Sequence, residues 1–262
     1  MTAPAPHKLA SASLMGVWAL FLGFAFLQVG HGLQRILLPI RAEAEGFGAT
    51  AMGLVMAAHF AGYLVGAKGI LRALSSVGHV RTFAALASLA STAVLVNAVV
   101  VMPLSWAAVY FISGICNAGV CVVLESWLND RATNENRGRI LSSYMVIMMG
   151  GTAVGQLLVN VGAPTGFELF VLSSVLISAA VIPVTMSAST TPTLPSPESM
   201  PIREIYRMVP SAVVGLFLCS FVQSAAGSMG AVFGTEMGMS TQRIALFTSA
   251  SVIGAVLLQL PL

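Results

Sequence analysis

The chain has 262 residues, of which 57% are hydrophobic and only 8% charged, with a formal net charge of +3. Soluble domains carry about 25% charged residues, so this composition excludes a soluble globular fold. The apolar residues lie in blocks of about 20 to 25, enough to cross a hydrocarbon core of about 30 Å as helices. The sequence therefore predicts an all-α polytopic membrane protein, because the short alternating segments of a membrane barrel do not occur in it.

Six predicted spans come first. The first is too long for the apolar region of a signal peptide, and we expect it to end at Pro39, since proline interrupts helices. Thr50 is the expected N-cap of the second span, and the third is expected to end at Pro103. The six ranges are 14–38, 50–74, 80–102, 106–128, 140–161 and 167–187.

A polar segment rich in Ser, Thr and Pro follows, SASTTPTLPSPESMP, and such a composition is typical of a linker. A seventh span is predicted over 209–231, and an eighth begins near Arg243 and stops at Leu262. The predicted organisation is a six-helix transmembrane bundle over 1–187, a cytoplasmic linker over 188–208, and the first two helices of a second bundle over 209–262. We expect a truncated chain, because an apolar run ends abruptly; the alternative is a complete eight-span protein.

Lys and Arg residues predict the orientation of the spans, because cytoplasmic loops are enriched in them. If the spans alternate, one side holds Lys8, Lys68, Arg72, Arg81, Arg131, Arg137, Arg139, Arg203 and Arg207, and the other holds Arg35, Arg41 and Arg243. The N-terminus is therefore predicted to be cytoplasmic. The basic residues form no single patch, so nucleic acid is not an expected partner.

Four segments read LLPIRAEAEGF, GHVRTFAAL, ESWLNDRATNENRGRILSSYM and GGTAVGQLL. These segments resemble the YcaD-like branch of the major facilitator superfamily. The resemblance implies a secondary transporter of the inner (plasma) membrane, with two six-helix bundles that alternate in access around a central cavity. It implies that the first, fourth and seventh spans line that cavity, and it supplies no substrate.

Three positions depart from the superfamily's patterns. Ser75 stands where an acidic residue is expected between the second and third spans, and Tyr110 stands where the fourth span usually carries Arg. The fifth span lacks the Gly-Pro signature of antiporters. These differences argue against a drug/proton antiport mechanism.

Glu125 ends an uncharged run that begins at Trp106. A carboxylate in the membrane is costly unless it is paired or reaches water, which leaves three interpretations. In the first, which the resemblance suggests, Glu125 and Arg81 form the ion pair of a cytoplasmic gate. In the second, Glu125 is a proton-coupling site, and in the third it lies among the headgroups and contacts Arg137 or Arg139.

Polar residues follow one face of the first span and of the fourth. Gln28, His31 and Arg35 share a face because of their helical spacing. Because polar groups are expensive in lipid, these faces should point into a shared cavity. The predicted cavity residues are Gln28, His31, Arg35, Tyr110, Asn117, Gln156 and Gln223. The alternative for each amide is hydrogen bonding between helices, and for Arg35 it is snorkelling to the surface.

The predicted function is secondary active transport of a small organic solute by a monomer. Arg35 and His31 would attract an anionic group, and His31, His59 and Glu125 are the candidates for coupling to protons. The scattered Cys and His residues suggest no metal site, and no cofactor is expected. A membrane scaffold or sensor is the alternative, and an intramembrane enzyme is less favoured because no His-Glu-x-x-His pattern occurs.

Small residues on the spans have a packing interpretation. Gly62 and Gly66 on the second span, Gly114 on the fourth, and Gly151 with Gly155 on the fifth are expected to allow close approach of helices.

Overall fold

The structure, a computed structural model, describes residues 6–186 and 202–259. Every regular element in these ranges is helical, which confirms the all-α prediction. The elements are α1 (Pro6–Ala44), α2 (Ala49–Val77), α3 (His79–Val99), α4 (Pro103–Arg131), α5 (Arg137–Leu157), the 3-10 turn η1 (Leu158–Val161), α6 (Glu168–Ala179), α7 (Val181–Met186), α8 (Ile202–Met208), α9 (Pro210–Glu236) and α10 (Thr241–Gln259). Within the described residues, seven segments are long and apolar enough to cross a membrane, and α10 contains a shorter apolar stretch.

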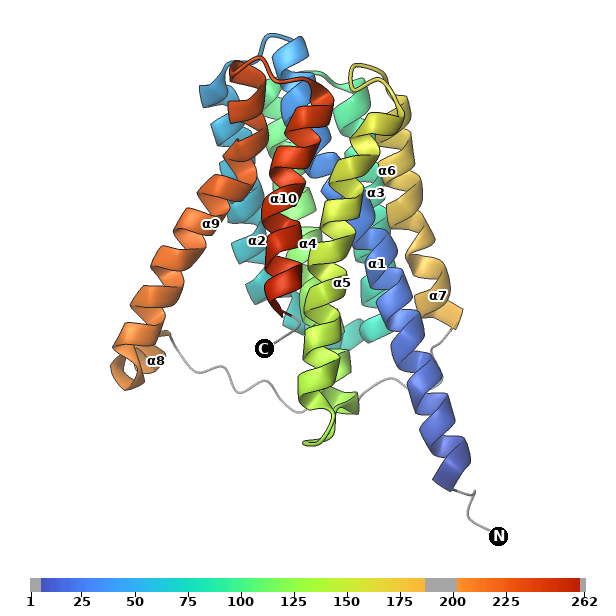
Figure 1. The fold of residues 1–262 in the computed structure, drawn as a ribbon. Coiled ribbons are helices and arrows are strands. Elements are labelled where there is room, and N and C mark those ends of the chain that lie inside the picture. Colours follow the sequence, from blue (N-terminus) through green and yellow to red (C-terminus); the bar gives the residue numbers. More distant parts are fainter. Residues whose placement is uncertain (1–5, 187–201, 260–262) are drawn as a thin grey trace.

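The long helices run side by side and alternate in direction (Figure 1). Helix α2 packs on α4, α1 lies between α5 and α6, and α3 contacts both α4 and α6. Helix α10 packs along α5, while α9 contacts α10, α1 and α2. Figure 1 shows α9 close to the bundle at its α10 end and diverging from it toward α8.

Two prolines do not act as predicted, and a third divides a predicted span. Pro39 lies inside α1, which continues to Ala44, because an apolar surrounding favours keeping the remaining backbone hydrogen bonds. Pro103 does not end the third span; it begins α4, where its fixed φ and missing N–H are tolerated. The sixth span is divided at Ala180 into α6 and α7, because Pro183 cannot donate to the carbonyl of Ala179 and its ring crowds that carbonyl.

Two further boundaries differ from the prediction. Helix α2 begins at Ala49 with Gly48 as its N-cap, so Thr50 lies in the first turn and is not the cap. Of the predicted linker, 188–201 lies outside the described residues, whereas 202–208 forms α8. This segment contains no internal Gly or Pro, and Pro201 and Pro210 bracket it, so a short helix fits between them.

The predicted packing role of the glycines is confirmed. A Cβ on Gly62 of α2 would overlap the carbonyl oxygen of Phe111, and one on Gly114 of α4 would overlap that of His59. A Cβ on Gly66 would come within 2.6 Å of the Ile115 oxygen. Only glycine allows the two backbones to approach this closely, so these positions fix the spacing between α2 and α4.

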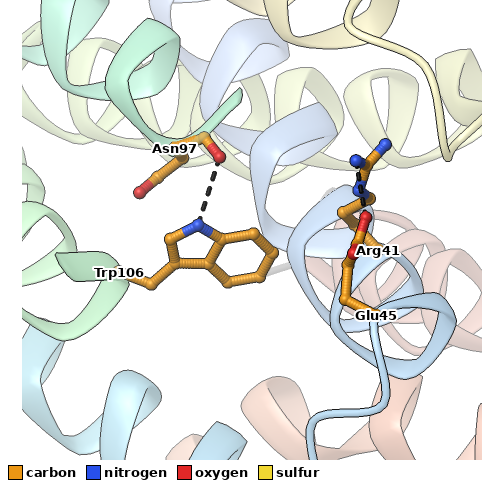
Figure 2. A network of polar contacts seen from close by, with 4 residues as sticks. All are labelled: Arg41, Glu45, Asn97 and Trp106. Atoms are coloured by element: carbon orange, nitrogen blue, oxygen red, sulfur yellow. Dashed lines mark hydrogen bonds and ion pairs between the residues drawn. The ribbon is translucent and has the colours of Figure 1, made fainter. Parts of the chain in front are cut away.

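Contacts at the end opposite the N-terminus brace the turns between helices (Figure 2). The buried indole of Trp106, at the start of α4, donates from Nε1 to the carbonyl oxygen of Asn97 in α3 at 3.1 Å. Arg41 pairs with Glu45 at 2.6 Å at the end of α1. Such a partly exposed ion pair contributes little, so the buried Trp106 contributes more to this end of the fold.

Candidate functional site

A cavity of about 710 Å³ lies between α1, α2, α4, α5, α9 and α10. It forms where the polar faces of these helices turn away from lipid, as the high cost of polar groups in hydrocarbon requires. Its volume falls within the range of roughly 300–1,000 Å³ that is typical of small-molecule sites.

The structure brings most of the predicted cavity residues together. The cavity is lined by Gln28, Arg35, Tyr110, Asn117, Gln156 and Gln223, and also by the proton-coupling candidate His59. His31 does not line it, although it shares the α1 face of Gln28 and Arg35. Its Nε2 is buried without a hydrogen-bond partner, and the ring lies within electrostatic range of Arg35 and His59. Solute binding by these side chains remains a prediction.

Among the residues that the structure describes, Arg35 is the single Asp, Glu, Lys or Arg side chain in the cavity lining. No carboxylate of those residues lies within 4.0 Å of its guanidinium. Its guanidinium lies within electrostatic range of His59 and Tyr110. The His59 and Tyr110 rings pack with their centroids 4.7 Å apart. We call Arg35, His59 and Tyr110 the polar cluster.

Two amide side chains of the cavity lining, Gln28 and Gln156, form hydrogen bonds to neighbouring helices. Gln28 donates weakly from Nε2 to the Met148 carbonyl at 3.5 Å, and its Oε1 is buried without a partner. Gln156 accepts a hydrogen bond from Ser249 at 3.3 Å, which links α5 to α10. The helix-to-helix bonding considered for the amides thus accounts for Gln156 well and for Gln28 in part.

The remainder of the lining is largely apolar, and sequence reasoning missed it. We call this set the apolar lining: Phe60, Met148, Met149, Met229, Phe233 and Phe247. Methionine and phenylalanine are equally suited to face lipid, so no signal in the sequence separated these residues from lipid-facing ones. Their place in the cavity gives it an apolar surface beside a single cation.

Glu125 lies outside the cavity lining, and its side chain is exposed near the C-terminal end of α4. Its Oε1 accepts a hydrogen bond from the Tyr144 hydroxyl at 3.0 Å, and the Tyr144 ring stacks on Phe24 at 4.9 Å. In this structure Glu125 therefore contacts Tyr144 and forms no ion pair with Arg81. Arg137 donates to Asn129 at 3.2 Å, away from Glu125.

Replacing Tyr144 by phenylalanine tests this contact. We expect the variant to lose about 0.5–1.5 kcal/mol of unfolding free energy, because the hydrogen bond disappears while the stacking on Phe24 stays. The measurement is unfolding of the purified protein in detergent. Tyr206→Phe, at an exposed tyrosine of α8, is the matched control, and equal stability of the two variants would show that the contact contributes nothing.

Metal-ligating side chains are dispersed in the described ranges. No group of three or more His, Cys, Asp or Glu lies close enough there to hold an ion. Cys116, Cys121 and Cys219 are free thiols, and Cys121 lines the cavity.

The chain is similar to proteins called uncharacterized MFS-type transporter YcaD. The relative from Escherichia fergusonii is 25% identical over 244 residues, which cover 91% of this chain and 64% of the relative. Relatives from Salmonella typhimurium and Salmonella typhi are 34% identical over 145 residues, 55% of this chain and 38% of theirs. The chain thus spans less than two thirds of the length of these curated relatives. No protein-family model matches it. The resemblance predicted from the sequence is confirmed by these relatives.

Proposed function

On the basis that this is a YcaD-like chain of the major-facilitator type, we propose that it forms part of a secondary transporter. The protein would move a small organic solute across a membrane by alternating access around the cavity. The relatives are named as transporters, which favours transport over catalysis.

One observation carries this proposal: polar faces of separate helices line one cavity among apolar helices. Gln28 and Arg35 come from α1, Asn117 from α4, Gln156 from α5 and Gln223 from α9. A scaffold would gain nothing from the cost of placing a charged side chain within the membrane-spanning bundle. A transporter needs such groups to replace the water that a solute loses on entering the membrane.

The orientation follows from the basic residues. We infer that the N-terminus is cytoplasmic and that the membrane is the inner membrane, because nine of the twelve Lys and Arg residues fall on the side of the N-terminus if the spans alternate. The solute is inferred to carry an anionic group, since Arg35 is the single charged side chain of the lining. Protons are inferred as the coupling ion, with His59 beside the cavity and His31 behind it in electrostatic range. We propose that the transporter acts as a monomer.

Flux through reconstituted vesicles tests the proposal. Proteoliposomes containing the protein should exchange a labelled organic solute across the bilayer faster than protein-free liposomes, and an acid-inside or acid-outside gradient should drive net uptake if protons are coupled. The control is the Asn117→Leu variant, which removes a polar group from the cavity. Absence of flux for every solute that binds the protein would favour the scaffold alternative.

The gate proposal has its own test. We infer that Glu125 leaves Tyr144 and pairs with Arg81 in another conformational state, so Arg81→Glu and Glu125→Arg should each reduce flux by roughly tenfold. The double variant restores opposite charges and should recover much of the loss. Double-variant flux no higher than that of either single variant would contradict the pair.

A further inference from the structure

The apolar lining raises the question of what occupies the space next to Arg35. The cavity volume of about 710 Å³ is far larger than an inorganic anion needs. Methionine and phenylalanine side chains from α2, α5, α9 and α10 form part of the surface beyond the polar cluster, beside amide and hydroxyl groups, and apolar surface of this kind gains by contact with an apolar ligand. A small, strongly hydrated anion would leave this surface in contact with water.

The polar cluster forms one part of the cavity lining. Arg35 lies within electrostatic range of His59 and Tyr110, and the last two rings pack together. The His59 Nδ1 atom is buried without a hydrogen-bond partner, as is Gln28 Oε1 on the same lining. A guanidinium with no carboxylate partner in the described residues suits the planar, bidentate geometry of a carboxylate.

Among the described residues, none of those that line the cavity has a carboxylate side chain. An amine or other cationic solute would therefore meet Arg35 with no compensating negative charge, and in a low-dielectric surrounding such repulsion is strong. A neutral solute would leave the guanidinium desolvated without a partner. Both alternatives are disfavoured by the same residue.

We propose that the cavity binds a carboxylate with an apolar body, its head group at Arg35 and its body against the apolar lining. This rests on the proposed transport function and specifies the class of solute for the same site. The head group supplies the charge that Arg35 lacks, and each methylene of the body buries surface against Met and Phe side chains. Affinity should then rise about fourfold per methylene until the body fills the lining.

Binding of a homologous series to the purified protein in detergent tests the proposal. The probes are acetate, butyrate, hexanoate and benzoate, with hexylamine and hexanol as matched compounds that lack the negative charge. Calorimetry should give dissociation constants that fall from acetate to hexanoate, and much weaker binding of hexylamine and hexanol. Equal affinity across the acids, or hexylamine bound as tightly as hexanoate, would overturn the proposal.

Two variants separate the head-group site from the apolar lining. Arg35→Gln should weaken the binding of all four acids by roughly 10- to 100-fold and leave the dependence of affinity on chain length unchanged. Phe233→Ser should reduce the dependence of affinity on chain length and should have little effect on the binding of acetate. Phe217→Ser, at an exposed position of α9 outside the cavity, is the matched control and should bind like the unaltered protein. If Arg35→Gln keeps full affinity for hexanoate, the head-group assignment is wrong.

Flux measured on the same preparations distinguishes this inference from the proposed function. If the acids bind with the expected dependence of affinity on chain length but hexanoate does not cross the bilayer, the inference stands and transport is contradicted. Flux of a cationic or neutral solute with no carboxylate binding would leave transport standing and contradict the inference.

Discussion

Replacing Gly62 by alanine is expected to destabilise the protein by about 1–3 kcal/mol, the usual range for overpacking. The added methyl group would overlap the carbonyl oxygen of Phe111, which belongs to the backbone of α4 and has no rotamer to escape into. Helices α2 and α4 would have to separate, and with them the cavity residues that each carries. The measurement is thermal or denaturant unfolding in detergent, accompanied by size-exclusion chromatography.

Gly69 offers a matched control on the same helix. A Cβ at Gly69 meets no atom within 4 Å, so Gly69→Ala should be neutral or should stabilise α2 by up to about 1 kcal/mol through helix propensity. A Gly62→Ala protein as stable as Gly69→Ala would show that the close approach of α2 and α4 does not support the fold.

Replacing Arg35 by glutamine is expected to reduce solute flux by roughly 10- to 100-fold, because a charge-assisted hydrogen bond to the solute is lost. Arg35→Lys keeps the charge without the bidentate geometry, so it should retain part of the flux. Proteoliposome exchange under saturating and subsaturating solute measures both variants.

Arg72→Gln is the control for this prediction. Arg72 is an exposed arginine of α2 that does not line the cavity, and its replacement should leave flux unchanged. If Arg35→Gln transports as well as Arg72→Gln does, Arg35 does not contact the solute and its interpretation as a snorkelling side chain is favoured.

Hydropathy predicted the fold class and the order of the spans because the bilayer sets the length of each apolar block. The helix ends were less predictable, since proline can interrupt, begin or lie inside a helix depending on what surrounds it. Pro183 divides the sixth span, whereas Pro39 lies within α1. The residues that follow the two prolines give no local sign of this difference.

The candidate site was predictable where its residues are polar. Gln28 and Arg35 were identified because hydrocarbon penalises them, and they do line the cavity. His31 lies on the same helical face but does not line the cavity. Helical spacing defines a broad face of α1, and only part of that face borders the cavity. Tyr144 was missed as the partner of Glu125, since residues on two helices reveal no contact through spacing in the chain.

The polar faces of α1, α4 and α9 are expected to meet in a cavity that water enters. Thiol labelling tests it, because the cysteine thiolate attacks a charged thiol reagent, and the thiolate forms in water and is suppressed in hydrocarbon. In a background with Cys116, Cys121 and Cys219 replaced by alanine, cysteines are placed at Asn117 and at Leu64, an exposed apolar residue outside the cavity lining. We expect a charged methanethiosulfonate to modify Asn117→Cys in membranes much faster than Leu64→Cys. Equal resistance of the two positions, with both reacting after denaturation, would contradict the account.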